Sequence, residues 1–285
     1  MDLKILKDTP PWDWPGAAGK TILAILRDPK AKASDRLTAA NLAGNTVVVN
    51  DALCDALLAI AGSAAEPAEL RAKAVISLGP VLEEAETEIL DGDEFDDPDA
   101  VPISLKTFRK IQQTLRTIYL DAAAPKAVRR RTLETAVRAP VEWHSGAIRT
   151  AWASQDPEWK LTAVFCMRYV RGFDKEILEA LESADSKIRY EAVHAAGNWQ
   201  VDEAWPHVAA LIAAADISKD LLLAAIGASA TIRPGEAGMI LADLADSSDE
   251  DISEAVAEAM SMAEGISDDE EDEDDEDFED DEPVH

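Results

Sequence analysis

The 285-residue sequence contains few cysteines, few aromatic residues and few basic residues relative to its acidic ones. Its two cysteines, Cys54 and Cys166, are too few for a disulfide scaffold and too far apart for a closely spaced metal-ligand pair, so they fit a reducing compartment. Lysine and arginine number 27 against 57 aspartates and glutamates, which gives a formal net charge of −30. This balance argues against a general binder of nucleic acid or of anionic membranes.

Long apolar runs are also absent. No segment approaches the roughly 20 apolar residues that cross a bilayer, and residues 1–16 contain no apolar stretch of signal-peptide length. We therefore expect a cytoplasmic protein with no membrane partner.

Alanine, in contrast, is abundant. The sequence holds 51 alanines, while apolar residues make up 47% of the chain and aromatic residues only 5%. Alanine is the best helix former, and its small side chain lets helices pack closely. The composition thus predicts an all-α fold.

A short pattern recurs along the chain: an arginine, an alanine three residues later and a glycine eight residues later. Complete copies begin at Arg36, Arg71 and Arg189. Degraded copies begin at Arg130, Lys160, Leu221 and Glu254. Successive starts lie 29 to 35 residues apart, except for one interval of 59 that contains an acidic insertion with glycine and proline at 91–102. A period of this length is typical of stacked helical hairpins.

Each copy follows an amphipathic segment and a short polar link, so each repeat is predicted to be a hairpin of two helices. The predicted pairs are 17–28 with 33–44, 48–62 with 66–88, 103–120 with 126–138, 144–154 with 157–171, 173–183 with 186–198, 203–214 with 217–229, and 235–246 with 250–263. Four pairs are predicted to supply the short polar links and the N-caps of second helices: Asp28-Pro29, Asp156-Pro157, Asp185-Ser186 and Ser247-Ser248.

Segments 156–163 (DPEWKLTA) and 188–192 (IRYEA) are the clearest matches to the Asp-Pro turn and Val-Arg-x-x-Ala second helix of the HEAT-repeat family in its bacterial short-repeat form. The chain resembles this family over roughly residues 16–264. The resemblance implies an armadillo-like α-solenoid of about seven stacked hairpins. It also implies that the repeated arginines, taken as Arg36, Arg71, Arg130 and Arg189, form hydrogen bonds between neighbouring repeats.

Charge is unevenly distributed. Residues 104–150, the basic band, hold ten basic and three acidic residues, whereas 14 of the 15 residues in Asp268–Glu282 are acidic. Such an acidic run is predicted to be disordered. The chain therefore divides into an aromatic, proline-rich leader at 1–15, a solenoid at 16–264 with the insertion at 91–102, and an acidic tail at 265–285.

The basic band has three possible explanations. Nearby acidic helices neutralise it, an acidic partner segment or a phosphate group binds Arg129, Arg131 and Arg138, or the acidic tail contacts it within the chain. The sequence does not choose among them.

Other residues that resemble functional sites are better explained by structural roles. No histidines have metal-ligand spacing, and the acidic insertion does not follow the calcium-loop pattern, so we expect neither a metal nor a cofactor. His144, beside Glu142 and Trp143, is either part of a small polar pocket or a capping and packing residue. Trp12 and Trp14 either cap the first repeat or form an exposed docking peptide.

The favoured function is a non-enzymatic scaffold or adaptor that binds another protein along its second helices. The predicted partner-binding residues are Arg129, Arg131, Arg138, Arg168, Tyr190 and His194. One alternative is an acidic mimic that binds basic proteins. Another is an enzyme, since the resemblance extends to HEAT-like DNA-repair glycosylases and bilin-attaching lyases. Nucleic acid is not expected as a partner because only the middle of the solenoid is basic.

Overall fold

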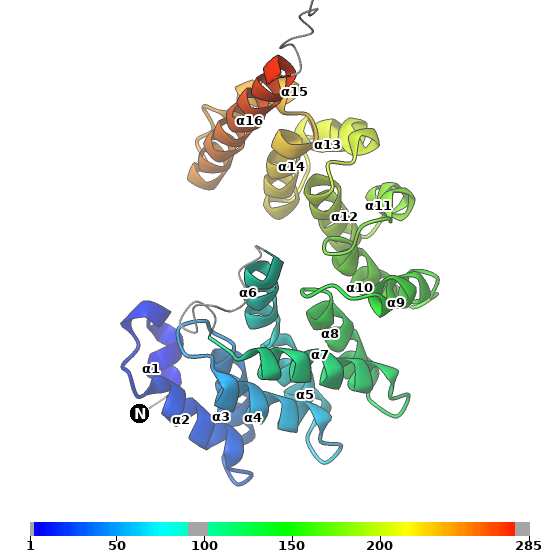
Figure 1. Cartoon of the computed structure of the whole chain (residues 1–285). Coiled ribbons are helices and arrows are strands. Elements are labelled where there is room, and N and C mark those ends of the chain that lie inside the picture. Colours follow the sequence, from blue (N-terminus) through cyan, green and yellow to red (C-terminus); the bar gives the residue numbers. More distant parts are fainter. Residues whose placement is uncertain (1–2, 91–101, 277–285) are drawn as a thin grey trace, which may run out of the picture. The chain divides into compact units, whose positions relative to one another are not determined.

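The structure, a computed structural model, describes residues 3–90 and 102–276 (Figure 1). Within these ranges every regular element is a helix and no strand occurs, which confirms the all-α prediction. The chain divides into two compact units, unit 1 (Met1–Thr150) and unit 2 (Ala151–His285). In the described ranges no helix combines the length and the apolar character needed to traverse a membrane.

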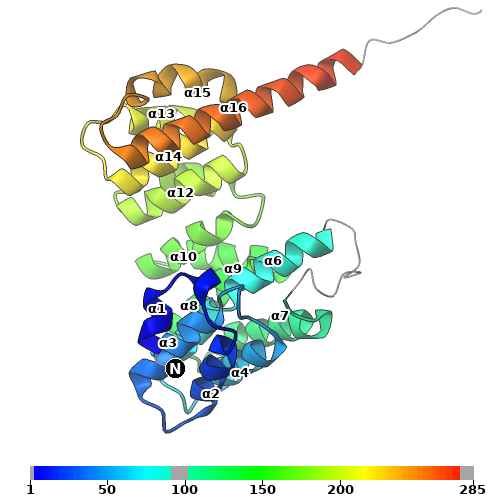
Figure 2. The same cartoon turned by 90° about the vertical axis from the view of Figure 1, so that its left-hand side faces the viewer.

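Three helical hairpins form most of unit 1 (Figure 2). They are α2 (Ala18–Arg27) with α3 (Ala33–Ala43), α4 (Asp51–Gly62) with α5 (Ala68–Ile76), and α7 (Leu105–Leu120) with α8 (Lys126–Ala136). The first helices α2, α4 and α7 pack in one row, and the second helices α3, α5 and α8 pack in another. This arrangement of two rows is that of a solenoid.

Unit 2 is also a stack of hairpins, in which the second helices form the continuous row. After α9 (Trp143–Trp152), which crosses the boundary between the units, its helices are α10 (Pro157–Met167), α11 (Asp174–Leu181), α12 (Ser186–Asn198), α13 (Trp205–Ile212), α14 (Lys219–Ile232), α15 (Pro234–Leu241) and α16 (Glu250–Glu276). The second helices α10, α12, α14 and α16 pack one on the next, and α11, α13 and α15 each pack on the second helix that follows. The predicted stack of hairpins is therefore confirmed within each unit.

The single helix predicted for residues 66–88 is divided into two helices in the structure. The segment 66–88 contains α5 and α6 (Gly79–Leu90), with a break at Ser77 and Leu78. Pro80 explains the break, because it has no backbone N–H with which to continue the hydrogen bonding of α5. As a result α6 turns away and packs against α8.

The leader at 1–15 contains a helix that the sequence pattern did not predict. Helix α1 (Leu3–Asp8) packs against α3 and buries Leu3 and Leu6. The indole N–H of Trp14 donates to the carbonyls of Leu6 and Thr9, at 2.9 Å in both cases. Trp14 is half-buried and packs against the apolar core of unit 1, in agreement with the predicted capping role, whereas Trp12 is 77% exposed.

The C-terminal helix α16 extends through Glu276, beyond the predicted end of the last repeat and into the acidic tail at 265–285. Residues 277–285, like 91–101 of the acidic insertion, lie outside the described residues. The disorder predicted for the tail stays a prediction.

Small residues of the repeat pattern lie where second helices meet. Ala39, Ala74 and Ala192 are completely buried. A Cβ atom on Gly44 would lie 2.0 Å from the carbonyl oxygen of Ser77, and one on Gly197 would lie 3.1 Å from Ala228. At these positions glycine and alanine are therefore required by the close approach of neighbouring repeats.

The repeated arginine binds the first helix of its own hairpin. Arg36 donates to Leu26 O at 3.3 Å, Arg71 to Ala61 O at 2.9 Å, and Arg129 to Tyr119 O at 2.9 Å, each ten residues back. These carbonyls lie at the ends of the first helices, where no intrahelical N–H reaches them. Arg189 differs from the others, because it donates to Ser183 O at 2.8 Å, six residues back in the link that follows α11. Arg36 in addition reaches the next repeat, through a 2.7 Å ion pair with Glu66.

Two expectations are corrected by these contacts. The third repeated arginine is Arg129 and not Arg130, because Arg129 lies four residues after Pro125, the N-cap of α8, and each of the other three lies four residues after its own N-cap. The implied role in joining neighbouring repeats is replaced mainly by a role within each hairpin.

Polar caps begin several second helices as predicted, but the prediction for Asp28 is wrong, because Asp28 is the C-cap of α2 and Lys32 is the N-cap of α3. The side chain of Asp156 accepts from the backbone N–H of Glu158 at 3.0 Å, and Asp185 accepts from Lys187 at 2.9 Å. Before α16 the side chain of Asp249, rather than Ser247 or Ser248, accepts from the first turn, at 3.1 Å from Asp251 N. These bonds satisfy N–H groups that have no partner inside the helix.

Candidate functional site

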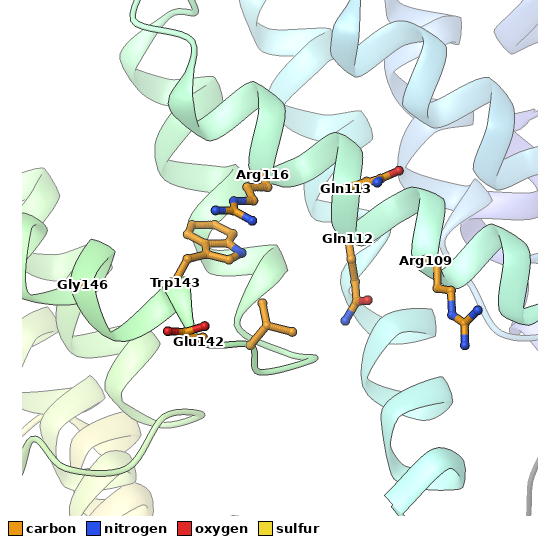
Figure 3. Close-up of a pocket in the computed structure, with 8 residues that line it drawn as sticks. Arg109, Gln112, Gln113, Arg116, Glu142, Trp143 and Gly146 are labelled. Atoms are coloured by element: carbon orange, nitrogen blue, oxygen red, sulfur yellow. The ribbon is translucent and has the colours of Figure 1, made fainter.

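An open groove of about 820 Å³ lies on unit 1 between α7 and the start of α9. We call it the α7–α9 groove. Its lining residues are Arg109, Gln112, Gln113, Arg116, Val141, Glu142, Trp143 and Gly146. Figure 3 shows the two arginines and two glutamines along one helix, with Glu142, Trp143 and Gly146 on the opposite segment.

Helix α7 supplies the basic wall because it is strongly amphipathic. Its N-terminus is capped by Ser104, whose hydroxyl accepts from the backbone N–H of Thr107 at 3.3 Å. Phe108, Ile111 and Leu115 are buried on the inner face. Arg109 and Arg116, seven residues apart, consequently point outward on the same face of the helix.

The opposite wall is held in place by aromatic packing. The Trp143 ring lies 5.2 Å from the ring of Tyr119 on α7 and 4.2 Å from the ring of His144, measured between centroids. His144 is buried, and its Nδ1 accepts the backbone N–H of Val141 at 3.1 Å. The half-buried Trp143 is thus a fixed part of the groove wall.

Burial also sets the charge of His144. Desolvation lowers the pKa of its imidazole from 6.5 to about 4, so the ring is neutral at pH 7. A neutral ring keeps Nδ1 available as the acceptor for Val141. The predicted capping and packing role of His144 agrees with this geometry, while its neighbours Glu142 and Trp143 line the groove.

The two groove arginines differ from other cations of the basic band. Lys110 pairs with Asp55 at 2.7 Å, Arg131 pairs with Glu134 at 2.5 Å, and Arg138 pairs with Glu83. Arg109 and Arg116 form no ion pair with any residue that the structure describes. Internal neutralisation therefore accounts for part of the basic band and leaves two guanidinium groups directed into the groove.

None of the six predicted partner-binding residues lines the α7–α9 groove. On unit 1, Arg129 holds α7 to α8 and stacks over Tyr119 at 5.6 Å, while Arg131 and Arg138 form the ion pairs given above. On unit 2, Arg168 pairs with Glu191 at 3.0 Å. Each of these four arginines takes part in a contact within its own unit.

The two aromatic candidates of unit 2 do meet. The rings of Tyr190 and His194 form an edge-to-face contact with centroids 4.6 Å apart. They line different small hollows: Tyr190 one of about 250 Å³, and His194 one of about 320 Å³ that also includes Met262. Burial, with a smaller contribution from the charge of Arg168, lowers the pKa of His194 to about 4.

The described residues do not form a metal centre. Within residues 3–90 and 102–276, no group of three or more His, Cys, Asp and Glu side chains has the arrangement of a metal site. The acidic insertion, whose sequence departs from the calcium-loop pattern, falls almost wholly outside these ranges. Both cysteines are buried and free, and burial raises the pKa of the Cys54 thiol to about 12.

Comparison with known proteins gives a distant structural likeness only. No family model and no curated protein sequence matches this chain. Among solved structures it is similar to human deoxyhypusine hydroxylase in complex with glycerol, at 17% identity and TM-score 0.41, covering 92% of this chain and 88% of that one.

Two other solved structures show similar values. The Escherichia coli protein YibA has 15% identity and TM-score 0.46, covering 88% of this chain and 84% of that one. A designed armadillo repeat protein has 14% identity and TM-score 0.34, covering 85% and 98%. These likenesses are too remote to carry an argument, so the fold rests on the packing described above.

Proposed function

We propose that the protein is a non-enzymatic helical-repeat scaffold of the HEAT type that binds another protein, and that the α7–α9 groove is its binding site. The observation that supports this proposal is the pair Arg109 and Arg116, which face the groove without a carboxylate partner among the described residues. Arginine, tryptophan and tyrosine dominate the energetic centres of protein interfaces.

The chemistry of the groove suits a peptide. Each guanidinium can bind a carboxylate through two parallel hydrogen bonds, and the two glutamines can pair with a peptide backbone. Trp143 and Val141, the latter 39% exposed, offer apolar surface in the same groove. A partner segment with acidic and apolar side chains is therefore the best match.

The test is capture with matched charge-reversed variants of the full chain. The variant Arg109→Glu/Arg116→Glu removes the basic wall, and Arg27→Glu/Lys30→Glu changes two exposed cations on another part of unit 1 by the same charge. At about 0.15 M salt, where charges more than about 8 Å apart are largely screened, we expect a partner retained by the wild type and the control to be lost from the groove variant. The same set of proteins retained by all three would contradict the proposal.

A second candidate is an acidic mimic that binds basic proteins. The net charge of −30 favours it, because such a charge attracts cationic surfaces over distances beyond direct contact. Its partners would be retained equally by the wild type and the groove variant, and would be released when the acidic residues of 268–282 are neutralised. The capture experiment therefore separates the two candidates.

A further inference from the structure

We propose that the partner segment bound by the α7–α9 groove is an amphipathic α-helix, which lies along α7 and presents two carboxylates, seven residues apart, to Arg109 and Arg116. This inference rests on the proposed function of the groove as a protein-binding site. It specifies the conformation and the residue spacing by which the partner is recognised. All residues that line the groove belong to unit 1.

The row of first helices is interrupted at the groove. Helix α2 packs against α4, and α4 packs against α7. In the described part of unit 1 no such packing joins α7 to α9, the helix predicted to begin the next hairpin. The two are linked instead through Tyr119, in the last turn of α7, and Trp143, the first residue of α9. The groove is therefore a place in the row where helix-on-helix packing is missing.

The groove residues of α7 have the pattern of a helix-packing row. They are Arg109, Gln112, Gln113 and Arg116, at spacings of three, four and seven residues from the first (Figure 3). These spacings place side chains on one side of a helix over two turns, and helices pack against each other through such rows. Arg109, Gln113 and Arg116 are exposed, so the row is open to a partner helix with complementary polar side chains.

The distance between the two arginines favours a helix over an extended segment. Seven residues of helix rise about 10.5 Å, so carboxylates at positions 1 and 8 of a partner helix match the separation of Arg109 and Arg116 and lie on one face. In an extended segment, side chains on one face are about 6.6 Å or about 13.2 Å apart. A helix therefore brings both carboxylates into register with both guanidinium groups, which can each bind through two parallel hydrogen bonds.

The opposite wall sets the remaining positions of the partner helix. Trp143 and Val141 offer apolar surface, and an added Cβ atom on Gly146 would meet nothing within 4 Å, so a helix has room to approach. Apolar residues at positions 4 and 5 lie on the two flanks of the acidic row, so one of them faces this wall in either direction of the helix. Glu142 repels carboxylates on that flank and restricts them to the side of α7.

Three fluorescein-labelled synthetic peptides test the spacing and the conformation, through fluorescence anisotropy with the full chain in about 0.15 M salt. Each places an eight-residue motif inside an alanine and glutamine helix of about 18 residues. The helix peptide has glutamates at motif positions 1 and 8 and leucines at 4 and 5. The shifted peptide has the same composition with glutamates at 1 and 6, which lie on different faces. The proline peptide is the helix peptide with proline at position 6, which breaks the helix.

We expect the helix peptide to bind about fivefold more tightly than either of the other two, as for the loss of one ion pair. In the Arg116→Glu chain its affinity should fall about fivefold. Lysine in place of one of its two glutamates should restore that affinity, because the pair is then reversed in sign. Lysine in place of the other glutamate should not, and the difference gives the direction of the helix. The Arg27→Glu/Lys30→Glu chain, altered outside the groove, should bind like the wild type.

Binding of the shifted peptide or the proline peptide as tightly as the helix peptide would overturn the inference. So would failure of the helix peptide to bind, or restoration by neither lysine peptide. A partner that is captured by the wild type and lost from Arg109→Glu/Arg116→Glu supports the proposed function whatever the conformation of its segment. Failure of this inference is therefore distinguishable from failure of the proposed function.

Discussion

The arginines of the second helices and the arginines of α7 have opposite environments and opposite roles. Arg36 and Arg71 are 8% and 6% exposed and donate to carbonyls at the ends of first helices. Arg109 and Arg116 are exposed on a first helix and form no ion pair among the described residues. In this stack of hairpins, position relative to the neighbouring helix therefore decides whether an arginine stabilises the fold or is available to a partner.

The close contacts between second helices should show the largest effects. Gly44→Ala places a methyl group 2.0 Å from the carbonyl oxygen of Ser77, and backbone cannot move away cheaply. We expect a loss of more than about 3 kcal/mol in the free energy of unfolding, at the upper end for overpacking.

A matched glycine provides the control for that measurement. Gly227 lies inside α14, where an added Cβ atom would meet nothing within 4 Å, so Gly227→Ala should stabilise the protein by about 0.5 to 1 kcal/mol through helix propensity. Urea unfolding of both variants measures the difference. Equal effects would mean that the two rows of helices do not approach as closely as described.

Arg71 tests the structural half of the comparison. Arg71→Met keeps much of the buried stem but removes the 2.9 Å hydrogen bond to Ala61 O, which is left buried without this donor. We expect a loss of about 2 to 3 kcal/mol in the free energy of unfolding, as for a hydrogen bond to a charged group. A loss below the effect of the exposed Arg27→Met variant would contradict the role of the repeated arginine as a clamp.

The repeat pattern predicted the hairpins well because it reflects a physical requirement, namely small residues where neighbouring helices touch. Alanine and glycine recur where helices touch, so Gly44, which lies against Ser77, and Gly197, which lies against Ala228, directly record the stacking. The pattern failed at 129–131 because three successive arginines fit it equally well. The N-cap Pro125, four residues before Arg129, resolves the position, and that information was present in the sequence.

The groove was harder to predict from sequence. The sequence identifies Arg109 and Arg116 only as members of the basic band, and Glu142 and Trp143 only as neighbours of His144. The two sets lie about 30 residues apart in sequence, and they meet only through the packing of Trp143 on Tyr119. The sequence feature that could have indicated the groove is a pair of arginines seven residues apart on the polar face of an amphipathic helix. Which of them lack carboxylate partners depends on side chains from other helices, which periodicity does not show.

His144 links the stability of unit 1 to the shape of the groove. Its pKa is lowered to about 4 in the folded protein from 6.5, so the unfolded chain binds more protons between these values and stability falls as the pH falls through this window. From pH 7 to pH 5 we expect His144 to account for a loss of about 2 kcal/mol.

Comparison with a variant isolates this contribution from the many carboxylates. In His144→Asn, the amide oxygen replaces Nδ1 as acceptor for the Val141 N–H and does not titrate. Urea unfolding at pH 7 and pH 5 should show a smaller decrease in stability for His144→Asn than for the wild type, and His207→Asn serves as the background control. Parallel pH profiles for His144→Asn and the wild type would indicate that His144 is not buried in the neutral form.

The smallest stability effects are expected at the groove arginines, and they complete the comparison. Arg109→Ala and Arg116→Ala remove exposed side chains with no ion pair in the described part of the chain, so each should change the free energy of unfolding by less than about 0.5 kcal/mol. A residue that stabilises nothing yet provides positive charge in an open groove is more readily explained by a ligand than by the fold. Should either variant instead cost as much as Arg71→Met, the arginines of α7 would belong with those of the second helices, and the groove would lose its basis as a binding site.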